Sequence, residues 1–219
     1  MTLFSRRTAL SIFAGLLVSA TSFGQALYQE GVQFTRLKQP MPVASGAQIE
    51  VLEVFSYACS HCARLEPTLE AWRKTMPKNA KFTALPAIFN DSWAVYARAY
   101  YAAEQLKIVE KTHGPLFKAI YEQNKQFNNV DDIANWYAAY GVTAKQFTDA
   151  FNAPGMEAKL KRVLELTPRY EVAGTPTLVI DGKYSFDVTS AGGLEKVTGL
   201  LNFLIQKAAS ERTAPRKGQ

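Results

Sequence analysis

Residues 49–62 read IEVLEVFSYACSHC, and this stretch decides the fold. Both alternating sets of side chains in residues 49–55 are largely apolar, which is typical of an interior strand covered on both faces. Beyond the strand, an apolar stripe recurs at helical spacing and consists of Cys62, Leu65, Leu69, Trp72 and Met76. The sequence therefore predicts a strand that leads directly into a helix whose first turn carries a dithiol, with a kink at Pro67.

The helix phase makes the two cysteines unequal. Cys62 continues the apolar stripe and is expected to point inward, whereas Cys59 precedes the first full turn and is expected to be accessible. A thiolate at Cys59 would face the positive end of the helix dipole and unpaired backbone N–H groups, which lower its pKa. His61, if protonated or donating a hydrogen bond, would stabilise that anion further.

Stabilising the thiolate favours the reduced protein and makes the disulfide a stronger oxidant. We therefore expect a substrate thiolate to attack Cys59, with Cys62 as the resolving partner. A structural disulfide is one alternative, but this pair closes almost no loop and would stabilise little. A zinc site is another, but zinc usually takes four N or S ligands and no second ligand pair accompanies these cysteines. No metal or other cofactor is expected.

Two further positions carry candidate chemistry. Glu53 interrupts the apolar strand six residues before Cys59. Burial would raise the pKa of its carboxyl and let it relay protons to or from the inner sulfur, unless the strand lies at an edge and the carboxylate reaches water. The Thr175-Pro176 pair precedes a predicted strand, where proline permits a cis peptide and an ordinary trans loop is the alternative.

The remainder of the chain divides into a helical block between two strand-bearing parts. The block from residue 92 to residue 170 includes Thr143 and Gln146 at capping-box spacing. Asp181-Gly182 between two short apolar runs indicates a hairpin. The other expected elements are strands at 32–37, 81–89 and 177–180, helices at 93–106, 115–121, 130–140 and 158–170, and a closing helix through 194–204.

Residues 1–26 are predicted to be a cleaved secretory signal. Arg6 and Arg7 precede a short apolar run, and small residues follow at 24–26. An uncleaved anchor is the alternative, and the paired arginines also resemble a twin-arginine signal, although Ala9 stands where that pattern has a large apolar residue. Export would place the dithiol in a compartment that permits disulfides.

Composition adds the expectation of one globular domain, with or without an insertion. The chain has 219 residues, of which 47% are hydrophobic and 20% are charged. Its net charge of +6 is scattered among acidic residues, so no nucleic-acid partner is expected. No coiled-coil seam indicates assembly, so a monomer is expected.

The order of these motifs resembles the DsbA family of thiol:disulfide interchange proteins. The resemblance rests on residues 51–56, the Cys59-Ser60-His61-Cys62 motif, the helical block and residues 174–184. It implies an α/β thioredoxin fold with an inserted all-helical domain, a cis Pro176 beside the dithiol, and Glu53 as a buried acid near Cys62. The implied parts are a signal at 1–26, the fold at 27–91, the insertion at 92–170, the rest of the fold at 171–208, and a disordered basic tail at 209–219.

The resemblance also implies an activity and its partners. The protein would be a periplasmic dithiol oxidase that passes the Cys59-Cys62 disulfide to reduced, unfolded exported polypeptides, and a membrane quinone-linked oxidase of the DsbB type would reoxidise it. The backbone near Thr175 would pair with extended substrate. Ser60 and Thr175 stand where the best-known members of the family have Pro and Val. Because both positions lie at the sulfur, redox potential and partner choice are the two family properties that the resemblance implies least directly for this chain. A periplasmic isomerase or reductase, and a peptide-binding chaperone, are the alternative functions.

Overall fold

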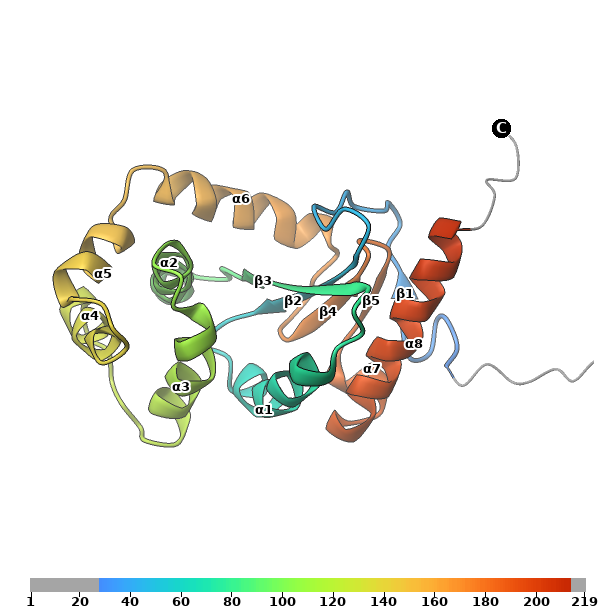
Figure 1. The fold of residues 1–219 in the computed structure, drawn as a ribbon, viewed down its shortest axis with the longest axis horizontal. Helices are drawn as coiled ribbons and strands as arrows, with labels where there is room; N and C mark the ends of the chain where they lie inside the picture. The colour runs from blue at the N-terminus through green and yellow to red at the C-terminus, as the bar shows by residue number, and fades with distance from the viewer. Residues whose placement is uncertain (1–27, 214–219) are drawn as a thin grey trace, which may run out of the picture.

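Strand β2 (Ile49–Phe55) lies inside a mixed five-stranded sheet with the order β1-β5-β4-β2-β3 (Figure 1). The computed structural model describes residues 28–213, so the predicted signal at 1–26 lies outside the described residues. β2 runs parallel to β3 and antiparallel to β4, with Glu53 opposite Ala84 and Leu178. The other strands are β1 (Thr35–Arg36), β3 (Ala80–Pro86), β4 (Thr177–Ile180) and β5 (Tyr184–Phe186).

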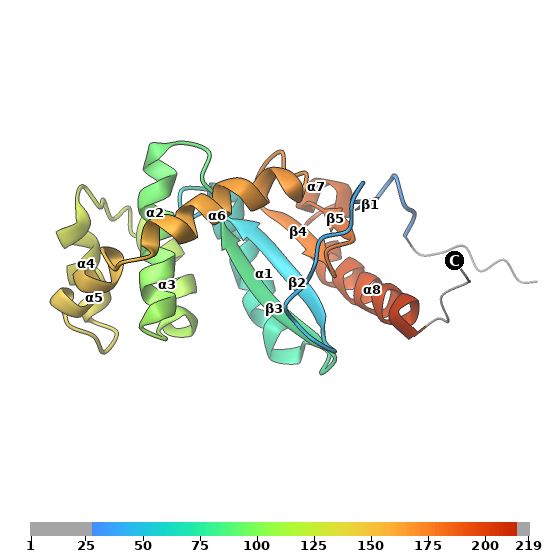
Figure 2. The same ribbon diagram turned by 90° about the horizontal axis from the view of Figure 1, so that it is seen from above.

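Helices cover both faces of the sheet and extend beyond one end of it (Figures 1 and 2). Helices α1 and α8 pack on one face, α6 crosses the other, and α2 to α5 form a separate helical layer. Their bounds are α1 (Ser60–Thr75), α2 (Asp91–Gln105), α3 (Val109–Tyr121), α4 (Val130–Ala138), α5 (Ala144–Phe151), α6 (Met156–Arg169), α7 (Val188–Ala191) and α8 (Leu194–Thr213). No helix within residues 28–213 is both long and apolar enough to cross a membrane.

All seven residues of β2 are buried, which confirms the interior strand. Val51 packs with Leu65 and other α1 and α8 side chains, whereas Leu52 packs with Val163 of α6. Because side chains alternate along a strand, Glu53 shares the face of Val51 and points toward α1. The chain thereby places a carboxyl under the helix that carries the dithiol.

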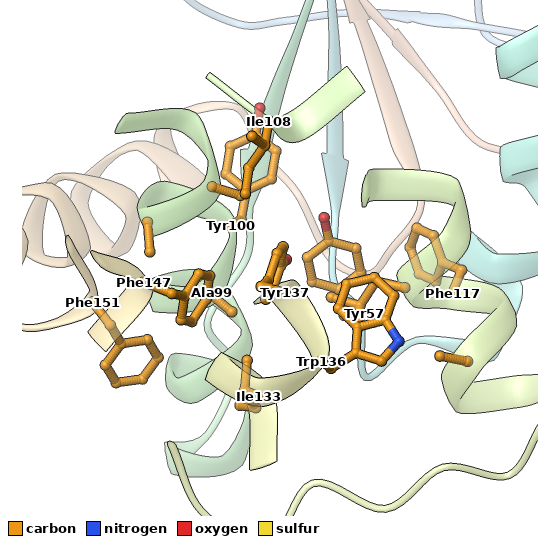
Figure 3. Close-up of a cluster of buried hydrophobic side chains, with 14 of the residues drawn as sticks. Tyr57, Ala99, Tyr100, Ile108, Phe117, Ile133, Trp136, Tyr137, Phe147 and Phe151 are labelled. Atoms are coloured by element: carbon orange, nitrogen blue, oxygen red, sulfur yellow. The ribbon is translucent and has the colours of Figure 1, made fainter. Parts of the chain in front are cut away.

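The helical layer has its own aromatic core, and the active-site loop takes part in it. Tyr57, two residues before Cys59, is fully buried in the cluster that includes Phe117 and Tyr137 (Figure 3). The Tyr57 ring lies 4.9 Å from that of Phe117. Packing between the loop and α3 therefore connects the dithiol to the helical layer.

Several predicted elements are confirmed and others are displaced. The capping box of Thr143 and Gln146 begins α5 as expected, and α1 continues through Pro67. Helix α3 begins at Val109, six residues before the predicted start at Pro115. Proline favours the first helical position, but Pro115 lies inside this helix, so it did not mark the start. The strand predicted at 32–37 is reduced to Thr35–Arg36 because a turn occupies the residues before it.

The Asp181-Gly182 hairpin is confirmed. Both residues have positive φ, 55° and 60°, and the Lys183 N–H donates to the carbonyl of Ile180 at 2.9 Å, as in a type I′ turn. A Cβ at Gly182 would also lie 2.2 Å from the carbonyl oxygen of Met41. Both the turn and this close approach therefore require glycine.

The predicted disorder of residues 209–219 is wrong for residues 209–213, which continue α8. Arg212 donates from Nε to the buried Asp181 carboxylate at 3.0 Å, and from Nη1 to the Gly46 carbonyl at 2.8 Å. These tertiary contacts hold the last turn of the helix. The basic composition of the segment gave no sign of them, because Asp181 and Gly46 are distant in sequence. Residues 214–219 lie outside the described residues.

Replacing Arg212 with alanine is expected to lower the free energy of unfolding by about 2 kcal/mol, because Asp181 stays buried with one partner fewer. The loss is smaller than for a wholly unpaired charge, since Lys183 Nζ remains 3.1 Å from Asp181. Urea unfolding of Arg212→Ala measures it, with the exposed neighbour Thr213→Ala as control. Equal midpoints for the two variants would contradict this structural role.

Candidate active site

The dithiol lies where β2 passes into α1. Cys59 is the N-cap of α1, with extended φ and ψ of −104° and 111°, and its sulfur accepts the Cys62 backbone N–H at 3.3 Å. The Cys59 thiol donates to the carbonyl oxygen of Thr175, also at 3.3 Å. Cys62 lies one turn further along α1 and is fully buried. Both cysteines are free thiols in this structure.

Cys59 is less accessible than predicted, with an exposed fraction of 7%. The loop that carries Thr175 packs against its sulfur, a contact that helix phase alone does not reveal. Cys59 is nevertheless the more accessible of the two cysteines, as predicted, because Cys62 has no exposed surface. The outer sulfur therefore lies in a narrow opening.

The environment separates the acidities of the two thiols. A hydrogen bond from the Cys62 thiol lowers the pKa of Cys59 to about 5; burial opposes this shift, while Thr175 and the backbone N–H groups of Cys62 and His61 add to it. Burial raises the pKa of the Cys62 thiol far above its ordinary range, and the nearby Glu53 adds to that shift. The site therefore favours a thiolate at Cys59 beside a thiol at Cys62.

His61 and Ser60 are both exposed in the first turn of α1. No hydrogen bond joins the imidazole of His61 to Cys59 within the described part of the chain, and its contribution to the thiolate comes from the backbone. His61 lines a groove of about 520 Å³ together with Arg64 and residues 173–177. The His61 side chain therefore borders the groove that begins beside Thr175.

The Thr175-Pro176 peptide bond is cis. Pro176 is buried, and the hydroxyl of Thr175 is buried without a hydrogen-bond partner. This loop leads into β4 and brings the Thr175 carbonyl to Cys59. The geometry joins two segments that are 116 residues apart in sequence.

Glu53 has an exposed fraction of only 1%. Burial raises the pKa of its carboxyl to about 8, and the charge of Glu66 adds to this shift while that of Arg73 opposes it. The edge-strand alternative is excluded, because Glu53 lies between two hydrogen-bonded neighbouring strands. Near neutral pH this carboxyl holds a proton close to Cys62.

Comparison with known proteins agrees with this geometry. A family model described as thioredoxin matches residues 44–197. A thiol:disulfide interchange protein DsbA of Pseudomonas aeruginosa is 33% identical over 210 residues, covering 94% of this chain and 98% of that protein. The chain belongs to the DsbA family. DsbA of Burkholderia cepacia is 30% identical over 206 residues, covering 94% of this chain and 97% of its own.

Solved DsbA structures show the same fold. The crystal structure of Pseudomonas aeruginosa DsbA has a TM-score of 0.80 at 32% identity, covering 85% of this chain and 97% of that one. DsbA from Xylella fastidiosa has a TM-score of 0.78 at 31% identity, covering 86% and 100%. These likenesses establish the thioredoxin fold with its helical insertion, and the chain is a periplasmic thiol:disulfide oxidoreductase.

This DsbA-family chain also carries a buried polar cluster that sequence reasoning missed. Arg73 holds Glu66 with two hydrogen bonds, at 2.6 and 3.4 Å, and His113 Nε2 lies 3.5 Å from a Glu66 oxygen. Glu66 is four residues after Cys62 on the apolar side of α1, which was a usable signal. His113 gave none, because only tertiary packing brings α3 to this place.

Polar atoms of Glu53, Glu66 and His113 lie within 4.8 Å of one another, a spacing that a metal ion could bridge. Both oxygens of Glu66 are already engaged by the Arg73 guanidinium, however, and a cation would lie beside that positive charge. The donor set therefore fits a proton better than a metal in this DsbA-family protein.

Proposed function

We propose that the protein oxidises reduced exported polypeptides by donating the disulfide between Cys59 and Cys62. The observation that carries this direction is the position of Cys59 at the N-cap of α1, which stabilises its thiolate. A stabilised thiolate favours the reduced state and is also a good leaving group, so electrons flow from substrate to this protein.

The exchange proceeds through a mixed disulfide. A substrate thiolate attacks Cys59 Sγ, a new S–S bond forms, and the Cys59–Cys62 bond breaks with its electron pair on Cys62. Protonated Glu53 supplies the proton that Cys62 takes up as it leaves. A second substrate thiolate then attacks the first substrate sulfur and releases Cys59 as a thiolate. The substrate loses two electrons and the protein gains them.

Residues around Cys59 form the proposed substrate contacts. Ser60 follows Cys59 directly in the chain, the Thr175 carbonyl contacts the sulfur, and Thr175 and Pro176 line the groove of about 520 Å³. The backbone of Thr175 would pair with an extended peptide, and His61 would face it across the groove. A membrane quinone-linked oxidase of the DsbB type would restore the disulfide.

Equilibration with glutathione tests the direction of electron flow. We expect a reduction potential well above the roughly −270 mV of a reducing thioredoxin, because the Cys59 thiolate is stabilised. Quenching with a thiol-alkylating reagent and counting modified cysteines gives the equilibrium constant, with Lys118→Gln on the neighbouring helix as a matched control. A strongly reducing potential would contradict the oxidase and favour the reductase. Efficient reshuffling of scrambled disulfides without net oxidation would favour the isomerase.

A further inference from the structure

His113 is the second histidine of the chain and lies far from the dithiol in sequence, on α3 of the helical layer. Its side chain is 7% exposed. Its Nδ1 lies 2.8 Å from the hydroxyl of Tyr57, in the loop before Cys59, and its Nε2 points toward Glu66. The imidazole therefore lies between the active-site loop and the buried acids.

Packing fixes the orientation of this imidazole. The surrounding rings, with centroids 4.8 to 6.1 Å from it, are Phe55, Phe117, Tyr57 and Tyr100. A flipped ring would lose the Tyr57 contact and place a carbon toward the carboxyls. When the Tyr57 hydroxyl donates to Nδ1, the ring proton resides on Nε2 and faces the acids.

Two buried polar atoms of this cluster have no hydrogen-bond partner, Glu53 Oε2 and His113 Nε2. Their side chains belong to the same cluster, in which a carboxylate oxygen of Glu53, one of Glu66 and a ring nitrogen of His113 lie within 4.8 Å of one another. A buried acceptor and a buried donor cost free energy while each has no partner, and this cost falls when the carboxylate accepts a hydrogen bond from the donor. The Nε2–H of His113 therefore stabilises Glu53 most when the Glu53 carboxyl is ionised.

We propose that His113 is a positioning residue of the redox site: its Nε2–H, oriented by Tyr57, supports the Glu53–Glu66 carboxyl pair and stabilises the Glu53 carboxylate left when Cys62 is protonated. This inference rests on the proposed role of Glu53. It assigns to the helical layer a part in proton transfer, because α3 supplies the imidazole that lies beside the buried acids of α1 and β2.

Charges around the cluster agree with such a role. Burial acts to raise the pKa of Glu66, but the nearby His113 imidazole and the Arg73 guanidinium outweigh it and lower that pKa. Arg73 therefore balances the charge of Glu66, whereas Glu53 forms no ion pair with any residue in the range 28–213. The titratable and charged groups around His113 are Glu53 from β2, Tyr57 from the loop, Glu66, Glu70 and Arg73 from α1, and Tyr100 from α2. Tyr137 from α4 acts on Tyr57.

Infrared spectroscopy of the isolated reduced protein tests the proposal directly. The C=O stretch of protonated Glu53, assigned by its loss in Glu53→Gln, gives the titration midpoint of that carboxyl. In His113→Leu the midpoint is expected about one pH unit higher than in wild type, because a donor to the carboxylate is lost. His113→Gln keeps an N–H near the same place and is expected to retain most of the wild-type value. Glu110→Gln, exposed on the same helix, is the charge control.

An unmoved midpoint in folded His113→Leu would overturn the proposal, as would an equal rise in His113→Gln. Tyr57→Phe keeps the ring packing and removes the orienting hydroxyl, so its midpoint should rise by a smaller amount. Nitrogen NMR of wild-type His113 needs no variant: a proton on Nε2 is expected, and a neutral ring protonated only on Nδ1 would overturn the proposal. These readouts use no substrate, so their failure is distinct from failure of disulfide transfer.

Discussion

Replacing Cys59 with serine is expected to abolish disulfide transfer to a reduced substrate, leaving only the uncatalysed rate. A hydroxyl can neither form the Cys59–Cys62 bond nor be attacked in thiol exchange, so the loss is of at least about 10³-fold. Cys62→Ser is expected to behave differently, because Cys59 can still join a partner sulfur while no resolving thiol is present. This second variant should accumulate mixed disulfides.

The measurement is oxidation of a reduced peptide by the preoxidised protein, followed by separation of mixed disulfides without reductant. Thr75→Ser, at the far end of α1, is the control for changes in the helix itself. Retained transfer by Cys59→Ser would refute the assignment of the attacked sulfur. Trapping by Cys59→Ser instead of Cys62→Ser would reverse the two roles.

The second large effect is on the unfolding free energy of the reduced protein, to which ionisation of Cys59 is expected to make a pH-dependent contribution. Its folded-state pKa of about 5 lies below the ordinary thiol value of 9.0. A group with a depressed pKa stabilises the fold fully at pH values above its pKa in the unfolded chain. This stabilisation decreases at lower pH and is lost as the pH falls through 5. With a discount for solvent screening, Cys59 contributes about 2 kcal/mol at pH 7.

Glu53 acts in the opposite direction, so total stability is not the right readout. Its folded-state pKa of about 8 is raised, so the unfavourable contribution of its ionisation grows as the pH rises from 4.5 toward 8. The difference in unfolding free energy between reduced wild type and reduced Cys59→Ser removes this common effect. Urea unfolding between pH 4 and 9 should show that difference growing above about pH 5. A difference that is constant with pH would contradict a stabilised thiolate.

Much of the site follows from local sequence. The β2 pattern and the apolar stripe of α1 predicted the strand, the helix and the inequality of Cys59 and Cys62, because periodicity reports which side chains face a core. Glu53 was also predicted to be buried, since its neighbours on both faces are apolar. Asp181-Gly182 predicted its hairpin, because few residue pairs adopt two positive φ angles.

Tertiary structure decided what segments distant in the chain do to one another. The limited exposure of Cys59 comes from the Thr175 loop, 116 residues away, and the order of residues 209–213 comes from Arg212 reaching Asp181. The partners of Glu53 are likewise supplied by packing, which brings His113 of α3 to Glu66 of α1. Local sequence thus determined where the dithiol and its acid lie along the chain. Long-range packing decided the pKa values of Cys62 and Glu53, because their burial depends on the whole fold, whereas contacts within the first turn of α1 lower the pKa of Cys59.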